Sequence, residues 1–123
     1  MILVDTSVWV DHLRHGDTAL ADCLNAGRVL AHPFVTGELA LGNLRQAAHI
    51  LESLRDLPQA AVATSGEVLH FISRHALSVL GVGYVDVHLL ASARLTPGAS
   101  LWTRDKRLLA VAARLSLAAN PPR

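Results

Sequence analysis

Cysteine is almost absent from the 123-residue sequence, with Cys23 as its single example. One cysteine cannot form a disulfide within the chain, so the sequence excludes a disulfide-stapled scaffold and indicates a reducing compartment, the cytoplasm. Hydrophobic runs long enough to cross a membrane are also missing, as is the basic segment that opens a secretory signal. We therefore expect a cytoplasmic protein without membrane contact.

Neither sign of charge predominates, because 11 Lys and Arg residues face 10 Asp and Glu residues, for a net charge of +1. The whole molecule thus lacks the basic surplus typical of nucleic-acid-binding proteins. Aromatic residues make up only 4% of the chain, so base stacking is not expected to drive binding to nucleic acid. Apolar residues, at 51%, are plentiful enough for one ordinary hydrophobic core.

Short apolar stretches alternate with longer segments of helical periodicity. Strands are predicted at 2–4, 28–31, 60–63 and 100–103, with a brief last strand opening at 117. Helices are predicted at 7–14, 18–25, 36–41, 44–57, 65–80, 86–95 and 105–115, with Asp17 or Thr18, Thr36 and Ser65 as expected caps. This alternation predicts an α/β fold, a single domain over 1–123 built as an α/β/α sandwich around a mostly parallel sheet. In such sheets, ligands bind beyond the carboxyl ends of the strands.

Four carboxylates occupy positions close to the predicted strand ends or helix starts: Asp5, Glu38, Asp86 and Asp105. A helix dipole stabilises an anion in the first turn by about 0.3–1 kcal/mol, which is an ordinary explanation for the last three. It does not explain Asp5, because a strand end has no such dipole. An ionised carboxylate there costs several kcal/mol to bury unless a donor or a cation accompanies it.

Convergence of these four side chains is the alternative explanation. Two like charges 4 Å apart repel by about 4 kcal/mol at an effective dielectric near 20, so such a cluster raises its own pKa values or binds a cation. All the ligands are hard oxygens and no Cys or His pair has zinc spacing, which favours Mg²⁺ or Mn²⁺. Such a site can activate water and offset charge on a phosphodiester in the transition state.

Four stretches of the sequence carry a family resemblance: DTSVWVD at 5–11, VTGELALG at 35–42, GVGYVDVHLLA at 81–91 and LWTRDKRL at 101–108. In this order and spacing they resemble PIN-domain ribonucleases of the VapC toxin type, from type II toxin–antitoxin systems. The resemblance extends over nearly the whole chain. It implies a PIN-like fold and a metal-dependent endoribonuclease that hydrolyses RNA phosphodiesters in line, with water as the nucleophile.

The resemblance also implies roles for individual residues. Asp5, Glu38 and Asp86 resemble the carboxylates that hold Mg²⁺ or Mn²⁺, and Asp105 resembles the fourth acid, which acts through water or a second ion. Supporting hydroxyls that orient a carboxylate or a water are matched by Thr6, Ser7 and Thr103. The implied partners are an RNA substrate, a cognate antitoxin protein that packs near the acidic site, and a second copy of the chain in a homodimer.

Basic residues near the predicted site are candidates for phosphate contacts: Arg14, Arg45, Arg104, Lys106 and Arg107. The last three flank Asp105, and the guanidinium group of arginine suits bidentate phosphate binding. Ordinary solvated charges are the alternative. If these residues bind RNA, the affinity falls as the salt concentration rises.

Other functions share parts of this pattern. A haloacid-dehalogenase-type phosphatase also begins with an apolar strand ending in Asp, but it needs a second Asp two residues later, where this chain has Ser7. A response-regulator receiver needs an acidic pair at the first strand end and a strand-end Asp near mid-chain, and neither is present. A PIN-type protein that binds RNA without cleaving it stays an alternative, although the intact acidic set argues against it.

Overall fold

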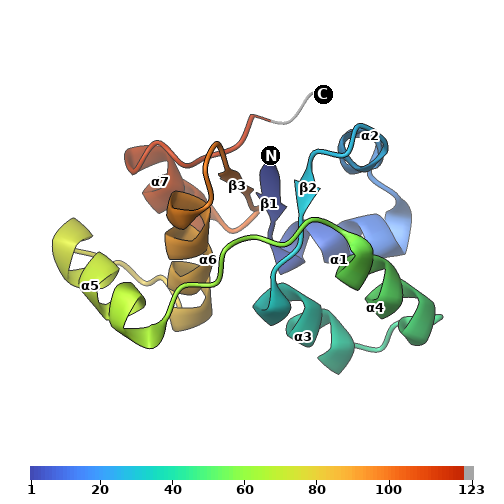
Figure 1. Ribbon diagram of the computed structural model, residues 1–123, viewed down its shortest axis with the longest axis horizontal. Helices are drawn as coiled ribbons and strands as arrows, with labels where there is room; N and C mark the ends of the chain where they lie inside the picture. The colour runs from blue at the N-terminus through green and yellow to red at the C-terminus, as the bar shows by residue number, and fades with distance from the viewer. Residues whose placement is uncertain (121–123) are drawn as a thin grey trace.

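The computed structural model describes residues 1–120, and within them three strands form one parallel sheet. The strands are β1 (Ile2–Val4), β2 (Val29–Leu30) and β3 (Ser100–Trp102), in the order β2-β1-β3. Leu3 pairs with Leu30 on one side and with Leu101 on the other. The start of the chain is therefore the central strand, and all three strands point toward the lower edge of the molecule in Figure 1.

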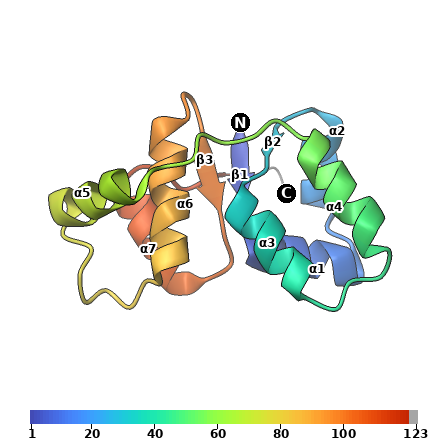
Figure 2. The same cartoon turned by 60° about the horizontal axis from the view of Figure 1, so that its bottom comes forward.

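Helices lie on both sides of this small sheet. They are α1 (Thr6–His15), α2 (Thr18–Asn25), α3 (Pro33–Leu41), α4 (Ala47–Asp56), α5 (Ser65–His75), α6 (Tyr84–Leu95) and α7 (Lys106–Arg114). Figures 1 and 2 show α1 to α4 on one side of the strands and α5 to α7 on the other. This arrangement confirms the predicted α/β class with a parallel sheet. Across residues 1–120, every helix is too short or too polar to span a membrane.

The core is built around β1 and α6. Ile2, Leu3 and Val4 are all buried, and α6 is buried continuously from Val87 to Ala93. A large apolar side chain contributes about 1.5–3 kcal/mol when it is fully buried. The carboxyl end of β1 and the first turn of α6 are thus fixed by the best-packed parts of the molecule, which places Asp5 and Asp86 on rigid supports.

The predicted strand at 60–63 is wrong. Only an isolated bridge between Ala31 and Gln59 forms there, with the Ala60 N–H donating to the Ala31 carbonyl at 2.9 Å. The next N–H group, of Ala61, donates instead to the Thr96 hydroxyl at 2.9 Å. A side chain thus replaces the neighbouring strand as hydrogen-bond partner, so the ladder stops after one rung. The predicted last strand is likewise a single bridge, between Leu101 and Ala118.

Several predicted helix boundaries are also wrong. The helix predicted to run to residue 80 ends at His75, because Ala76 adopts a left-handed conformation (φ 53°). Its cap is Thr64 rather than Ser65, in a reciprocal capping box with Glu67. Helix α3 begins at Pro33 rather than at residue 36, with the His32 side chain accepting the Phe34 N–H. Helix α6 begins two residues earlier than expected, and α4 three residues later.

Candidate functional site

Asp5 lies between β1 and α1, with only 6% of its surface exposed. Its Oδ1 accepts the Thr6 N–H at 2.7 Å, and its Oδ2 accepts the hydroxyls of Ser7 at 2.8 Å and Thr103 at 2.7 Å. Hydrogen bonds to an ionised acceptor are about twice as strong as neutral ones. Three such donors offset much of the cost of burying this carboxylate, which explains how the end of a buried strand tolerates it.

The three hydroxyls singled out in the sequence all contact site carboxylates. Thr103 and Ser7 bond Asp5, whereas the Thr6 hydroxyl donates to Oε1 of Glu38 at 2.7 Å. Ser7 and Thr103 are also linked to the chain that follows β3. They accept the backbone N–H groups of Arg104 and Asp105, each at 3.1 Å.

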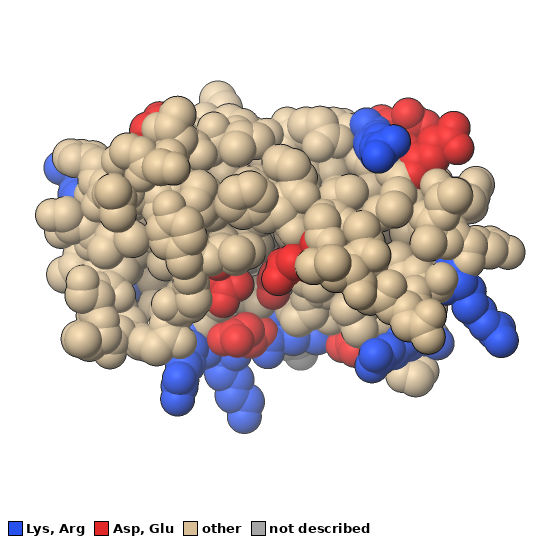
Figure 3. All heavy atoms as spheres, turned by 90° about the horizontal axis from the view of Figure 1, so that it is seen from below, with Lys and Arg blue, Asp and Glu red and all other residues tan. Residues whose placement is uncertain are grey.

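The pKa of Asp86, in the first turn of α6, responds to the charges of the other three acids. Burial is the largest cause that raises its pKa, to about 6, and the charges of Asp5, Asp105 and Glu38 raise it further, in that order. The charges of the other three carboxylates are therefore felt at Asp86, at the carboxyl edge of the sheet. Figure 3, which views this edge from below, shows acidic side chains gathered near its centre, with basic side chains along the lower side of the group.

The donor set fits a hard divalent cation, because it consists of carboxylate oxygens alone. Within residues 1–120, however, no three His, Cys, Asp or Glu side chains are placed to hold a metal ion together. The carboxylates are engaged in hydrogen bonds instead: Asp5 and Glu38 accept from the hydroxyls, and Asp105 accepts the Leu108 N–H at 2.9 Å.

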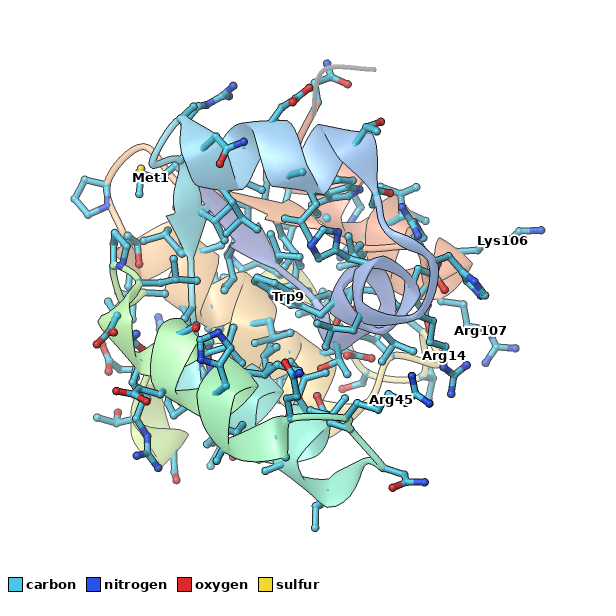
Figure 4. The ribbon with its side chains drawn as sticks, turned by 90° about the vertical axis from the view of Figure 1, so that its right-hand side faces the viewer. Met1, Trp9, Arg14, Arg45, Lys106 and Arg107 are labelled. Carbon is cyan, nitrogen blue, oxygen red and sulfur yellow. The ribbon has the colours of Figure 1, made fainter. Side chains whose placement is uncertain are left out.

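Basic side chains rim the same edge. Arg14 and Arg45 line a hollow of about 650 Å³ between α1, α3 and α4, into which Glu38 also faces. Figure 4 shows these two arginines close to each other, with Arg107 and Lys106 extending from α7 on the same side. Arg107 packs over Gly81, where an added Cβ would lie 2.7 Å from the guanidinium.

Arg104 does not join this rim. Its guanidinium forms ion pairs with Asp11, in the middle of α1, and with Asp17, the cap residue of α2. These pairs could not be predicted from the sequence, because the partners are 93 and 87 residues away and no local spacing signals them. The guanidinium that was a candidate for phosphate binding is thus already engaged by two carboxylates.

His32, which no sequence motif singles out, also lies close to the site. It is fully buried, its Nδ1 accepts the Phe34 N–H at 3.0 Å, and its Nε2 lies 3.0 Å from the Ser92 hydroxyl. Because Nδ1 accepts, the proton is on Nε2 and the ring is neutral. Burial, with His88 nearby, lowers the His32 pKa to about 4. This histidine ties the start of α3 to α6, the two helices that carry Glu38 and Asp86.

Comparison with known proteins matches the chain to one family. The family model described as PIN domain matches residues 2–114, a span that includes all four carboxylates. Two Mycobacterium tuberculosis proteins called Ribonuclease VapC32, from strains CDC 1551 / Oshkosh and ATCC 25618 / H37Rv, are each 48% identical to the chain over 118 residues. Each alignment covers 96% of this chain and 95% of the relative.

Proposed function

The chain belongs to the PIN domain family, and we propose that it is a metal-dependent endoribonuclease toxin of the VapC type, which hydrolyses RNA phosphodiesters. The observation that supports this proposal is the raised pKa of Asp86, to which burial contributes most and the charges of Asp5, Asp105 and Glu38 add. Carboxylates that repel one another in this way attract a divalent cation. The names of the two relatives support RNA as the substrate.

We assign Asp5, Glu38 and Asp86 to the binding of Mg²⁺ or Mn²⁺, and Asp105 to a contact through water or with a second ion. When bound, the ion supplies positive charge at the phosphate and makes a water more acidic. Ser7 and Thr103 fix the orientation of the Asp5 carboxylate, and Thr6 restrains Glu38. Burial, with the charges of the other three acids, raises the pKa of Asp86 to about 6, so this carboxyl gains most from the positive charge of a bound cation.

RNA reaches this edge across the basic rim. Arg14 and Arg45 flank Glu38 on one side, and Lys106 and Arg107 extend from α7 beside Asp105 (Figure 4). Phosphate contacts by these four residues would hold the backbone across the acidic site without reading its sequence. Their contribution to affinity decreases as salt increases.

The partners proposed for the chain are an antitoxin protein and a second copy in a homodimer, within the cytoplasm. The hollow between α1, α3 and α4 supports the first, because it opens beside Glu38 and combines Arg14 and Arg45 with apolar Leu13 and Ile50. A peptide with apolar side chains could pack there and extend a basic group to the carboxylates.

Cleavage of RNA by the purified protein, with Mg²⁺ or with EDTA, tests the proposal. We expect EDTA to stop cleavage and Asp5→Asn to reduce its rate on the order of 10³-fold. The carbonyl of the introduced amide can still accept the Thr6 N–H, and the Ser7 and Thr103 hydroxyls can turn to accept from its NH₂ group, so the fold is retained. Asp22→Asn, on the exposed surface of α2, is the matched control.

The outcome separates the alternatives. Cleavage by Asp5→Asn at the parental rate, or cleavage that EDTA does not affect, contradicts the assignment. RNA binding without cleavage by the parent protein identifies a non-cleaving RNA-binding PIN protein instead. Sequencing of RNA ends after expression of the parent and of Asp5→Asn then locates the cleavage sites.

A further inference from the structure

We propose that Arg104 is a positioning residue for the acidic site, which clamps the connection between β3 and α7 onto α1 and α2. By this clamp it keeps Ser7 and Thr103 against the Asp5 carboxylate. The effect on RNA cleavage rests on the proposed function, whereas the effect on the local structure does not.

The clamp joins three separate segments. The two terminal guanidinium nitrogens of Arg104 contact different carboxylates, Nη1 that of Asp11 on α1 and Nη2 that of Asp17, the cap residue of α2. The Asp17 carboxylate also accepts the Leu20 N–H at 2.9 Å. The backbone N–H of Asp17 donates to His12 Nδ1 at 3.0 Å. Asp17 is thus fixed by its own helix before it holds Arg104, so the anchor is rigid.

The backbone of Arg104 carries this constraint to the site. Its N–H donates to the Ser7 hydroxyl at 3.1 Å, and that hydroxyl donates to Oδ2 of Asp5 at 2.8 Å. The preceding residue, Thr103, donates to the same oxygen at 2.7 Å. Two of the three donors to Asp5 therefore depend on where the chain runs between Trp102 and Asp105. The Arg104 side chain fixes that path from outside.

The chemistry of the clamp requires arginine. A planar guanidinium can bond two carboxylates from different elements at once, whereas a lysine ammonium is a point charge on a flexible stem. The Arg104 side chain is 36% exposed and lies 6.0 Å from the Trp102 ring, in cation–π range. Ion pairs this exposed contribute little to global stability, so the clamp is expected to act on local geometry.

The same geometry argues against Arg104 as an RNA contact. With Asp11 and Asp17, it forms a group of three charges whose sum is −1, and such a group repels a phosphate. Arg107 and Lys106, in the first turn of α7, extend from the surface instead (Figure 4). Loss of a positioning residue should lower kcat, whereas loss of an RNA contact should raise KM.

Steady-state cleavage of one RNA by Arg104→Lys, Asp11→Asn and Arg107→Gln tests this difference, with Arg28→Gln as the control for removal of an exposed arginine. We expect Arg104→Lys to lower kcat about 10–100-fold, the range for partners that orient ligating groups, with KM within about twofold. Asp11→Asn should also lower kcat, but by a smaller factor than Arg104→Lys, because Asp17 still holds Arg104. Arg107→Gln should instead raise KM and weaken its dependence on salt.

A second measurement does not depend on activity. Hydrogen exchange of the Arg104 and Asp105 amides, both bonded to site hydroxyls, should accelerate at least about tenfold in Asp11→Asn and in Arg104→Lys, and not in Arg28→Gln. If Arg104→Lys fails to fold, Asp11→Asn alone decides, since it removes one exposed partner only.

The outcomes are distinguishable. If Arg104→Lys raises KM at constant kcat, or Asp11→Asn strengthens RNA binding at full kcat, Arg104 is an RNA contact and the inference is wrong. Parental kcat with parental exchange in both variants also overturns it. If the parent protein does not cleave RNA, the proposed function fails, and hydrogen exchange still decides whether Arg104 holds the connection to Asp5.

Discussion

Asp5 and Asp105 occupy equivalent places in the chain, each at the junction between a strand and the helix after it, yet the structure uses them differently. Asp105 is an ordinary helix cap, exposed, with its Oδ1 accepting the N–H of Leu108 three residues on. Asp5 is buried, and its carboxylate accepts only the adjacent Thr6 N–H from α1, while Oδ2 turns to the two hydroxyls. Both residues are N-caps, but capping accounts for the contact of Asp105 with α7 and for only one of the three hydrogen bonds that the Asp5 carboxylate accepts.

The side chain of Asp5 is thus held in one orientation, whereas that of Asp105 is free to change its hydrogen-bond partner. Three donors hold the Asp5 carboxylate, so it can act as the reference point for a cation. Asp105, at the exposed rim, can exchange its cap for a water or an ion at small cost. The same strand-to-helix junction thus holds one carboxylate rigidly and leaves the other exposed, depending on which neighbouring side chains reach it.

The largest expected effect comes from loosening the Asp5 carboxylate. Thr103→Val removes a hydroxyl from Asp5 at nearly constant side-chain volume, and we expect the cleavage rate to fall about 10–100-fold. Thr103→Ser keeps the hydroxyl and is the matched control. Cleavage rates at saturating RNA measure the difference. Equal rates for the two variants would show that Asp5 does not need this donor, and the contrast with Asp105 would lose its basis.

A smaller effect is expected in the pH dependence of stability of the cation-free protein. The pKa of Asp86 is raised from 3.8 to about 6, so the folded state binds more protons between these values than the unfolded state. The free energy of unfolding should therefore fall as the pH rises from about 4 to about 6, by about 1–2 kcal/mol after allowance for partial exposure of the side chain.

Denaturant titrations in EDTA at pH values of about 4.5 and about 7.5 measure this fall, since most of the transition lies between them. Asp86→Asn should remove it, and Asp5→Asn should reduce it more than Asp105→Asn, because Asp5 raises the pKa of Asp86 more than Asp105 does. If Asp105→Asn reduces the fall in the free energy of unfolding more than Asp5→Asn does, Asp105 has the larger effect on the pKa of Asp86, and the expected order of the two acids is wrong.

The smallest effect concerns the cap itself. Asp105→Ala should destabilise the protein by about 1 kcal/mol, whereas Asp105→Asn, which can still accept the Leu108 N–H, should cost only a few tenths. Thermal unfolding in EDTA measures both. If the two variants are equally unstable, Asp105 stabilises the fold by its charge and not as a cap.

The residues that sequence analysis could find are those with local signals. Short apolar runs located β1 and β3, and the position of each acid beside a strand end or a helix start singled out Asp5, Glu38, Asp86 and Asp105. The run at 60–63 misled because its alternative partner, Thr96, lies 35 residues from Ala61. The same limit hid the contacts of Arg104 and of His32, which depend on pairings across most of the chain.

The position of β1 in the middle of the sheet has a consequence for the order of folding. Its two neighbours come from opposite ends of the chain, and the Asp5 N–H pairs with the carbonyl of Trp102. Contacts of such high sequence separation form late, because long loops must close first. Before Thr103 emerges from the ribosome, a nascent chain lacks one of the three donors to the Asp5 carboxylate and the strand that pairs with Val4. The acidic site is therefore completed only after residue 105 has been synthesised, and cleavage activity should be absent from every shorter intermediate.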